Sequence, residues 1–175
     1  VDTDAIHQRL DDGDIMLISP LGYSPTGEIF NLALEEVATQ VAVRIPAHKL
    51  LFLMETEGVR NGRRQLLTEL STKDADALLA ASRAKLPPDV QHYLPCAIRA
   101  VREGVKRAHL ISRHVDGALL MELFTHHGIG TMIVLESPDK LRDAALADID
   151  GLLAIIDPLV AQGIQFGKTP VMDSL

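Results

Sequence analysis

Apolar residues recur along much of the chain at the three- and four-residue spacing of amphipathic helices. The series before Pro46 consists of Phe30, Leu34, Val37, Ala38, Val41 and Ile45. This spacing predicts a helix over 30–45, with Asn31 and Glu35 four residues apart on its polar side. The same pattern predicts helices over 3–11, from Thr72 to the residues before the two prolines at 87–88, and over 88–103, where Gly104 ends the last of them.

Short, continuously apolar runs lie between these helices, at 15–18, 49–54, 108–111 and 132–135. Runs of this length without alternation are typical of strands that are covered on both faces. Because such strands alternate with helices, the sequence predicts an α/β fold, a three-layer sandwich around a mainly parallel sheet.

Two segments are rich in turn-forming residues. Residues 20–29 contain two prolines and two glycines and predict a loop, in which Tyr23 is expected to be exposed. Residues 55–70 contain Asn61 followed by Gly62 and predict a hairpin-like excursion from the sheet.

The stretch from His109 to Val134 organises the rest of the chain. A short helix over 117–124 is predicted, with Leu119, Leu120, Leu123 and Phe124 at inward spacing. It is followed by a turn, Gly128-Ile-Gly-Thr131, whose glycines permit positive φ and leave backbone amides unshielded.

Glu122 on this helix is a candidate partner for a ligand cation, and the backbone groups of the turn could hold the ligand's other polar atoms. From the residues alone, an equally open interpretation is that the turn only connects a helix to a strand. His109, a histidine within an apolar strand, then has the alternative interpretation of an ordinary core residue.

Composition and charge exclude several classes of function. The net charge of −7 disfavours nucleic-acid and anionic-membrane surfaces, and no apolar stretch approaches membrane-spanning length. Cys96 is the single cysteine, so we expect no disulfide framework and a reducing, cytoplasmic setting, with Cys96 an inert core residue. No signal peptide opens the chain, and its first residue is Val1 instead of Met. The initial valine predicts a fragment or a processed product.

No metal site and no catalytic residue is assigned from the sequence. Of the seven histidines, His126 and His127 are adjacent, and no cysteine or carboxylate completes a ligand spacing around them. Acetyl transfer would need a general base and amides for a thioester carbonyl, and residues 1–135 offer no specific set of that kind.

The motif E-L-F-T-x-x-G-I-G-T, with a histidine thirteen residues before its glutamate, resembles the arginine-sensitive members of the amino-acid kinase fold. These are the N-acetylglutamate synthases and the arginine-inhibited acetylglutamate kinases. The resemblance implies that His109, Glu122 and Gly128, together with Lys49 at the start of a buried strand, bind the feedback inhibitor L-arginine.

The positions that correspond to the kinase site depart from the kinase pattern. An Asn…Asp pair is represented by Asn31 and Glu35, and Tyr93 stands where acetylglutamate kinases carry a catalytic lysine after a Gly-Gly pair. A phenol brings no positive charge to a transferring phosphoryl group, so the resemblance favours the synthase over the kinase.

Residues 137–175 resemble the start of a GNAT-type acetyltransferase domain, which follows the kinase-like domain in the synthases. A strand over 141–146 and a helix from Asp148 are predicted, without the glycine-rich acetyl-CoA cradle, and the segment 167–175 leaves the family pattern. We therefore expect residues 1–136 to be the C-terminal part of an amino-acid-kinase-like domain and this 175-residue piece to lack catalysis on its own.

The resemblance implies a parent enzyme that transfers acetyl from acetyl-CoA to L-glutamate in the first step of arginine biosynthesis, under inhibition by L-arginine. Acetyl-CoA would be a substrate, no permanent cofactor is expected, and a homo-oligomer is implied. Acetylglutamate kinase and a non-catalytic arginine-binding module stay open as alternatives.

Overall fold

The computed structural model describes residues 2–125 and 128–136, together with residues 149, 151, 153, 156 and 158. The chain divides into two units, Val1–Pro138 and Asp139–Leu175. In the second unit the described residues are helical, as the sequence predicts for the segment after Asp148. The strand expected over 141–146 lies outside the described residues.

The first unit contains a four-stranded sheet with the order β3-β5-β6-β4. Its strands are β3 (Lys49–Met54), β4 (Glu69–Ser71), β5 (Arg107–Ser112) and β6 (Thr131–Val134). β3 pairs with β5 and β4 with β6 in parallel, whereas β5 and β6 are antiparallel. The predicted α/β fold with a mainly parallel sheet is therefore confirmed.

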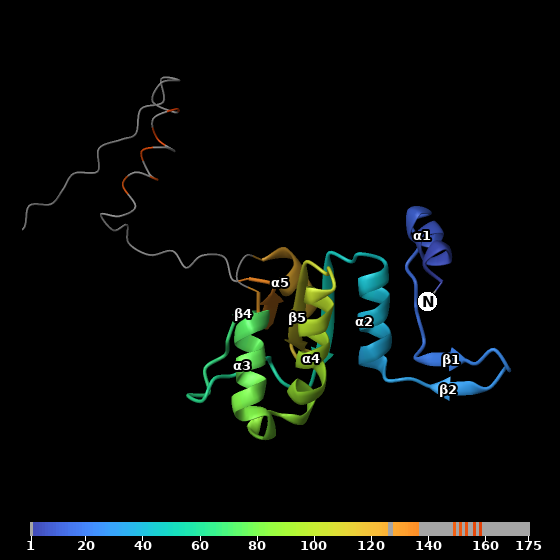
Figure 1. Ribbon diagram of the computed structural model, residues 1–175, viewed down its shortest axis with the longest axis horizontal. Helices are drawn as coiled ribbons and strands as arrows, with labels where there is room; N and C mark the ends of the chain where they lie inside the picture. Colours follow the sequence, from blue (N-terminus) through green and yellow to red (C-terminus); the bar gives the residue numbers. More distant parts are fainter. Residues whose placement is uncertain are drawn as a thin grey trace, which may run out of the picture. The chain divides into compact units, whose positions relative to one another are not determined.

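Helices pack on both faces of this sheet (Figure 1). One face meets α2 (Leu34–Arg44), α3 (Thr72–Ser82) and α4 (Pro88–Arg102), and a short 3-10 helix, Arg83–Lys85, joins the last two. Ser71 caps α3, because its hydroxyl accepts a hydrogen bond from the Asp74 backbone N–H. The other face meets α5 (Ala118–Phe124).

Alternate residues of each strand point to opposite sides of the sheet. The side against α2, α3 and α4 is the apolar core, to which the strands contribute Leu50, Phe52, Met54, Ala108, Leu110 and Ile133. The second side carries Leu51, His109 and Met132, which are direct neighbours across β3, β5 and β6. Leu53 on this side is 47% exposed, so the expectation that β3 is covered on both faces is wrong there.

The N-terminal segment differs most from the prediction. α1 (Thr3–Asp11) forms as expected, but residues 15–18 form no strand, and the side chains of Ile15 and Leu17 are fully exposed. A strand needs a neighbouring backbone to satisfy its N–H and C=O groups, and within the described residues none pairs with this segment.

The loop predicted over 20–29 contains a small hairpin instead. β1 (Leu21–Tyr23) pairs with β2 (Ile29–Asn31) in antiparallel register, and Tyr23 is exposed as expected. Because Phe30 and Asn31 belong to β2, the helix predicted to begin at residue 30 begins only at Leu34. Asn31 and Glu35 therefore do not share a helix face.

α5 has the predicted position but the opposite orientation. Its buried residues are Ala118 and Glu122, which are four residues apart. The residues expected to face inward, Leu119, Leu120, Leu123 and Phe124, are 37% to 80% exposed. Hydrogen bonds to the Glu122 carboxylate hold the polar side of this short helix against the sheet. These contacts, and not the spacing of the apolar residues, determine which side of the helix faces the sheet.

The excursion between β3 and β4 has the expected form. Arg60 and Leu66 form an isolated antiparallel bridge, and the Asn61 side chain accepts hydrogen bonds from two backbone N–H groups in the turn between them. The sequence did not indicate that this excursion ends in a strand, β4, on the far side of β6.

We expect Gly130→Ala to lower the free energy of unfolding by about 1–3 kcal/mol, the usual cost of overpacking. A Cβ at this glycine would lie 2.6 Å from Ile111 Cγ2 and would also overlap the backbone carbonyl oxygen of Leu110, which cannot rotate away. Urea denaturation followed by circular dichroism measures the change.

Gly62→Ala is the matched control, because a Cβ there meets no atom within 4 Å and the backbone has no positive φ. We expect it to change stability by less than about 1 kcal/mol. Equal stability of the two variants would contradict the close approach of the Gly130 loop to β5.

Candidate functional site

A cavity of about 420 Å³ lies on the second side of the sheet, beside α5. The strands contribute Lys49 from β3, Arg107 and His109 from β5, Glu69 from β4, and Met132 and Val134 from β6. α5 contributes Glu122 and Leu123, and the segments around the strands contribute Thr68, Thr125, Gly128 and Gly130. The lining of this cavity thus contains positively charged side chains, negatively charged side chains and glycine backbone.

The Glu122 carboxylate is the structural centre of this cavity. Its side chain is buried, and it accepts hydrogen bonds from the backbone N–H of Ile129 at 2.7 Å and of Gly130 at 3.3 Å, both through Oε2. Its other oxygen, Oε1, lies 2.6 Å from His109 Nδ1. A buried carboxylate is costly unless it is paired in this way. Glu122 therefore fixes the glycine turn and the His109 ring relative to each other.

The two glycines of the turn are required by this close approach. Gly128 has a φ of +55°, and a Cβ there would lie 2.6 Å from Glu122 Oε2. Gly130 lies against the backbone of β5 in the same manner. A side chain at Gly128 would therefore collide with the carboxylate itself, and one at Gly130 would collide with β5.

The protonation states of His109 and Glu122 follow from their burial and their mutual contact. Burial lowers the pKa of His109 below the ordinary imidazole value, although its hydrogen bond to Glu122 opposes this shift. Burial by itself would raise the pKa of Glu122, but the hydrogen bonds from Ile129 and His109 outweigh it and lower that pKa. At neutral pH Glu122 is therefore an anion and His109 is uncharged.

This assignment determines where the imidazole proton lies. Because Glu122 Oε1 is an acceptor, His109 Nδ1 carries the proton and donates it, and Nε2 carries a lone pair. Nε2 is buried and has no hydrogen-bond partner within the described part of the protein. Buried polar groups in proteins are nearly always hydrogen-bonded, and a donor group of a molecule in the cavity is one way to satisfy Nε2.

The charges around the cavity suit a molecule that is both anionic and cationic. Lys49 and Arg107 are paired in register at the start of β3 and β5, so two cations lie at one end of the strands. Glu69 on β4 and Glu122 on α5 supply negative charge. A small zwitterion with an additional donor group matches this arrangement.

All four residues that the resemblance assigns to an arginine site, Lys49, His109, Glu122 and Gly128, line this one cavity. Sequence reasoning missed Arg107 and Glu69. Arg107 could have been found, because it precedes His109 by two residues in a strand and therefore faces the same side. Glu69 could not, because β4 was not predicted.

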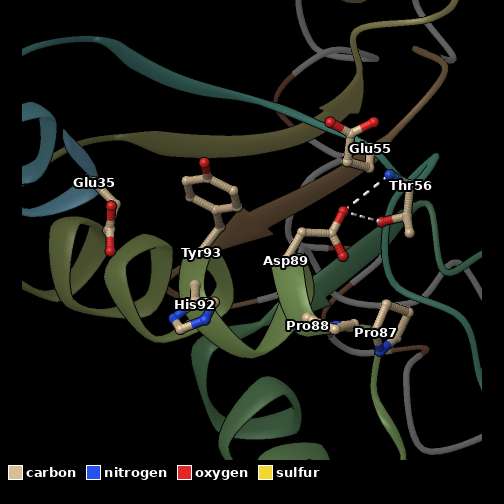
Figure 2. Close-up of a pocket in the computed structure, with 8 residues that line it drawn as sticks. All are labelled: Glu35, Glu55, Thr56, Pro87, Pro88, Asp89, His92 and Tyr93. Atoms are coloured by element: carbon tan, nitrogen blue, oxygen red, sulfur yellow. Dashed lines mark hydrogen bonds between the residues drawn. The ribbon is translucent and has the colours of Figure 1, made fainter. Parts of the chain in front are cut away.

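A second cavity, of about 500 Å³, lies beyond the C-terminal ends of β3 and β5 (Figure 2). Its lining residues are Glu35, Glu55, Thr56, Pro87, Pro88, Asp89, His92 and Tyr93. Asp89 accepts hydrogen bonds from the backbone N–H and the hydroxyl of Thr56, both at 2.9 Å. Of the three positions that correspond to the kinase site, the structure brings Glu35 and Tyr93 together here, whereas Asn31 does not line the cavity.

The other candidate residues have structural surroundings. Cys96 is buried, and its sulfur lies 3.8 Å from Glu36 Oε1. Burial raises the pKa of its thiol. No group of metal-ligating side chains occurs among the described residues, and His126 and His127 lie outside them. No helix in the described part is long and apolar enough to cross a membrane.

The chain is similar in sequence and in structure to several known proteins. Amino-acid acetyltransferase from Escherichia coli strain K12 is 45% identical over 166 residues, which is 94% of this chain and 38% of that protein. N-acetylglutamate synthase from Neisseria gonorrhoeae in complex with coenzyme A and L-arginine matches with a TM-score of 0.75 and 33% identity, over 98% of this chain and 39% of that one.

The structure of the Neisseria gonorrhoeae enzyme in complex with coenzyme A and N-acetyl-glutamate matches with a TM-score of 0.73 and 35% identity, over 97% of this chain and 39% of that one. The chain thus spans less than half the length of these relatives. The sequence profile of the amino acid kinase family matches residues 1–112, which include α1 to α4 and the strand that carries His109. This chain therefore belongs to the amino acid kinase family.

Proposed function

We propose that the chain is part of an N-acetylglutamate synthase, which transfers acetyl from acetyl-CoA to L-glutamate in the first step of arginine biosynthesis. The similarity to amino-acid acetyltransferases over 94% of the chain supports this function. Acetyl-CoA and L-glutamate are substrates in this proposal, and none of the described residues is assigned to either of them.

The segment from Lys49 to Val134 carries the feedback site for L-arginine in this proposal. The observation that supports it most strongly is the meeting of Lys49, His109, Glu122 and Gly128 in one cavity with a buried, hydrogen-bonded carboxylate. A similar synthase from Neisseria gonorrhoeae has been solved in complex with L-arginine, which is consistent with such a site.

The cavity offers a partner for each polar end of arginine. Lys49 has the charge that attracts the ligand carboxylate, and Gly128 exposes backbone groups that a side chain would block. Glu122 uses three of its acceptor positions within the protein, so it offers its negative charge and one remaining lone pair of Oε1 to the ligand cation. Charge-assisted contacts of this kind are the stronger hydrogen bonds in binding sites.

Acetylglutamate kinase is disfavoured as the alternative by the chemistry of the second cavity. Among the described residues, its lining contains the carboxylates Glu35, Glu55 and Asp89 and no lysine or arginine (Figure 2). Phosphoryl transfer requires cationic groups around the phosphates. The carboxylates of this lining instead repel the negatively charged phosphates. Tyr93 instead stacks at 5.1 Å, between ring centroids, on the core residue Phe52.

The domain organisation belongs to the same proposal. Residues 1–136 form the C-terminal part of the kinase-like domain, and 137–175 begin a GNAT-type acetyltransferase domain. We assign the protein to the cytoplasm, with Cys96 as a free thiol, and to a homo-oligomer, as in the family that its motif resembles. A non-catalytic arginine-binding module differs from this proposal only in the absence of acetyl transfer, which an assay of the chain together with its downstream sequence would measure.

We expect Glu122→Gln to weaken L-arginine binding by about one to two orders of magnitude. The substitution keeps the shape of the side chain but removes the charge that faces the ligand cation. Calorimetric titration of L-arginine into the two proteins measures the difference.

Glu55→Gln is the matched control, because Glu55 also contacts a histidine, His114, at 2.6 Å, but is exposed and lies outside the arginine cavity. It should leave the affinity unchanged. Equal affinities of wild type and Glu122→Gln would contradict the proposed site.

We also expect no phosphoryl transfer from ATP to acetylglutamate, because no lysine or arginine occurs among the described residues that line the second cavity. An ADP-release assay should stay at background. Turnover of the order of 1 s⁻¹, which is ordinary for kinases, would overturn the assignment to the synthase.

A further inference from the structure

The tip of the excursion between β3 and β4 is a turn in which Asn61 is followed by Gly62. The Arg64 backbone N–H closes this turn by donating to the Asn61 carbonyl oxygen at 2.9 Å, and Gly62 is exposed. The chain has one other asparagine, Asn31, which precedes Leu32. Asn61 is therefore the asparagine that is followed by a residue without a side chain.

The Asn61 side chain is folded back along the backbone of this turn. Its Oδ1 accepts hydrogen bonds from the backbone N–H of Arg63 at 2.9 Å and of Gln65 at 3.0 Å. Its Nδ2 donates to Gln65 Oε1 at 3.1 Å. These contacts fix the orientation of the side-chain amide and keep its carbon, Cγ, beside the backbone of Gly62, which lies between Asn61 and the first donor.

The Gly62 backbone nitrogen is available for reaction. Its N–H donates no hydrogen bond to another described residue, whereas the N–H groups of the residues before and after it do. A Cβ at Gly62 would meet no atom within 4 Å, so the approach to this nitrogen is open. The turn thus leaves free the amide that can close a succinimide ring with Asn61 Cγ.

We propose that Asn61 is a modification site, at which the folded turn promotes deamidation of the side chain by water. Gly62 N loses its proton to a hydroxide ion, attacks Asn61 Cγ and forms a C–N bond. The Cγ–Nδ2 bond then breaks, and Nδ2 takes up a proton from water and leaves as ammonia, which regenerates the hydroxide.

A second water molecule opens the succinimide ring. Attack at Cγ breaks the new bond to Gly62 N and gives aspartate at position 61. Attack at the backbone carbonyl carbon breaks the original peptide bond and gives isoaspartate, in which the chain continues through the side chain. In both cases an amide and water become a carboxylic acid and ammonia, and the acid ionises.

The two N–H donors on Oδ1 form an oxyanion hole for this reaction. Negative charge develops on Oδ1 when Gly62 N adds to Cγ, and backbone donors that are already in place stabilise it. The side chain is also held in one orientation beside its nucleophile, which removes part of the entropic cost of ring closure. The unfolded chain has neither advantage.

Positive charge surrounds the same turn. Arg60, Arg63 and Arg64 flank Asn61, and among the described residues only Arg60 has an ion-pair partner, Glu57. Nearby cations favour the anionic intermediate, although salt screens charges that are exposed.

The base of the excursion keeps the turn in place. The buried Val59 donates its backbone N–H to Thr131 Oγ1 at 2.8 Å, and its carbonyl oxygen accepts the Leu67 N–H at 2.8 Å. Arg60 and Leu66 form the adjacent antiparallel bridge. The arrangement around Asn61 therefore persists for as long as the protein is folded.

The test is incubation of the folded protein at mildly alkaline pH, followed by proteolytic digestion and mass spectrometry of the peptides. Fragmentation that distinguishes isoaspartate from aspartate identifies the products. We expect conversion of Asn61, with isoaspartate among the products, while Asn31 stays unchanged. The conversion should be at least as fast in the folded protein as in the same protein unfolded in urea.

Gly62→Ala is the matched variant, because its Cβ meets no neighbouring atom but hinders the nitrogen that must attack. We expect loss of the conversion over the same period, with an unchanged circular dichroism spectrum.

Three results would overturn the proposal. They are the absence of conversion at Asn61, a slower conversion in the folded protein than in urea, and conversion of Gly62→Ala at the wild-type rate. The inference does not rest on the proposed arginine site, and titration of L-arginine tests that site separately.

Discussion

The buried Glu122 carboxylate is the interaction on which the candidate site depends. It joins three elements that are separate in the sequence: α5, the glycine turn through the N–H groups of Ile129 and Gly130, and β5 through His109. A charge at this depth persists because each of its oxygens accepts a hydrogen bond. It also explains why α5 buries Ala118 and Glu122 instead of its leucines, since the hydrogen-bonded face of the helix must meet the sheet.

The geometry of the sheet adds the other half of the site. The strict alternation of side chains along β3, β5 and β6 separates an apolar core face from a face that carries charged and polar groups. His109 can therefore occupy the central strand without disturbing the core, because Ala108 and Leu110 on either side of it face the helices. The apolar core and the candidate site thus occupy opposite sides of the same three strands.

Much of this arrangement could be predicted from the sequence. Apolar runs and helical periodicity predicted β3, β5, α3 and α4, because these elements are buried enough for their pattern to be set by the core. Gly128 and Gly130 were identified from their spacing, since the turn needs residues without a Cβ. Elements whose structure depends on polar contacts or on strand pairing were mispredicted. The orientation of α5 is set by the hydrogen bonds of Glu122, and Asn31 belongs to the β1–β2 hairpin and not to a helix. The apolar run at 15–18 has no paired neighbour among the described residues.

The central claim is that arginine occupies the cavity around Glu122, and not the one around Tyr93. The most direct measurement is an NMR titration of the ¹⁵N-labelled chain with L-arginine, read at the backbone amides. The account predicts that the largest shifts occur at Gly128, Ile129 and Gly130 and in β5 around His109. Shifts concentrated around Tyr93, with the glycine turn unchanged, would contradict it.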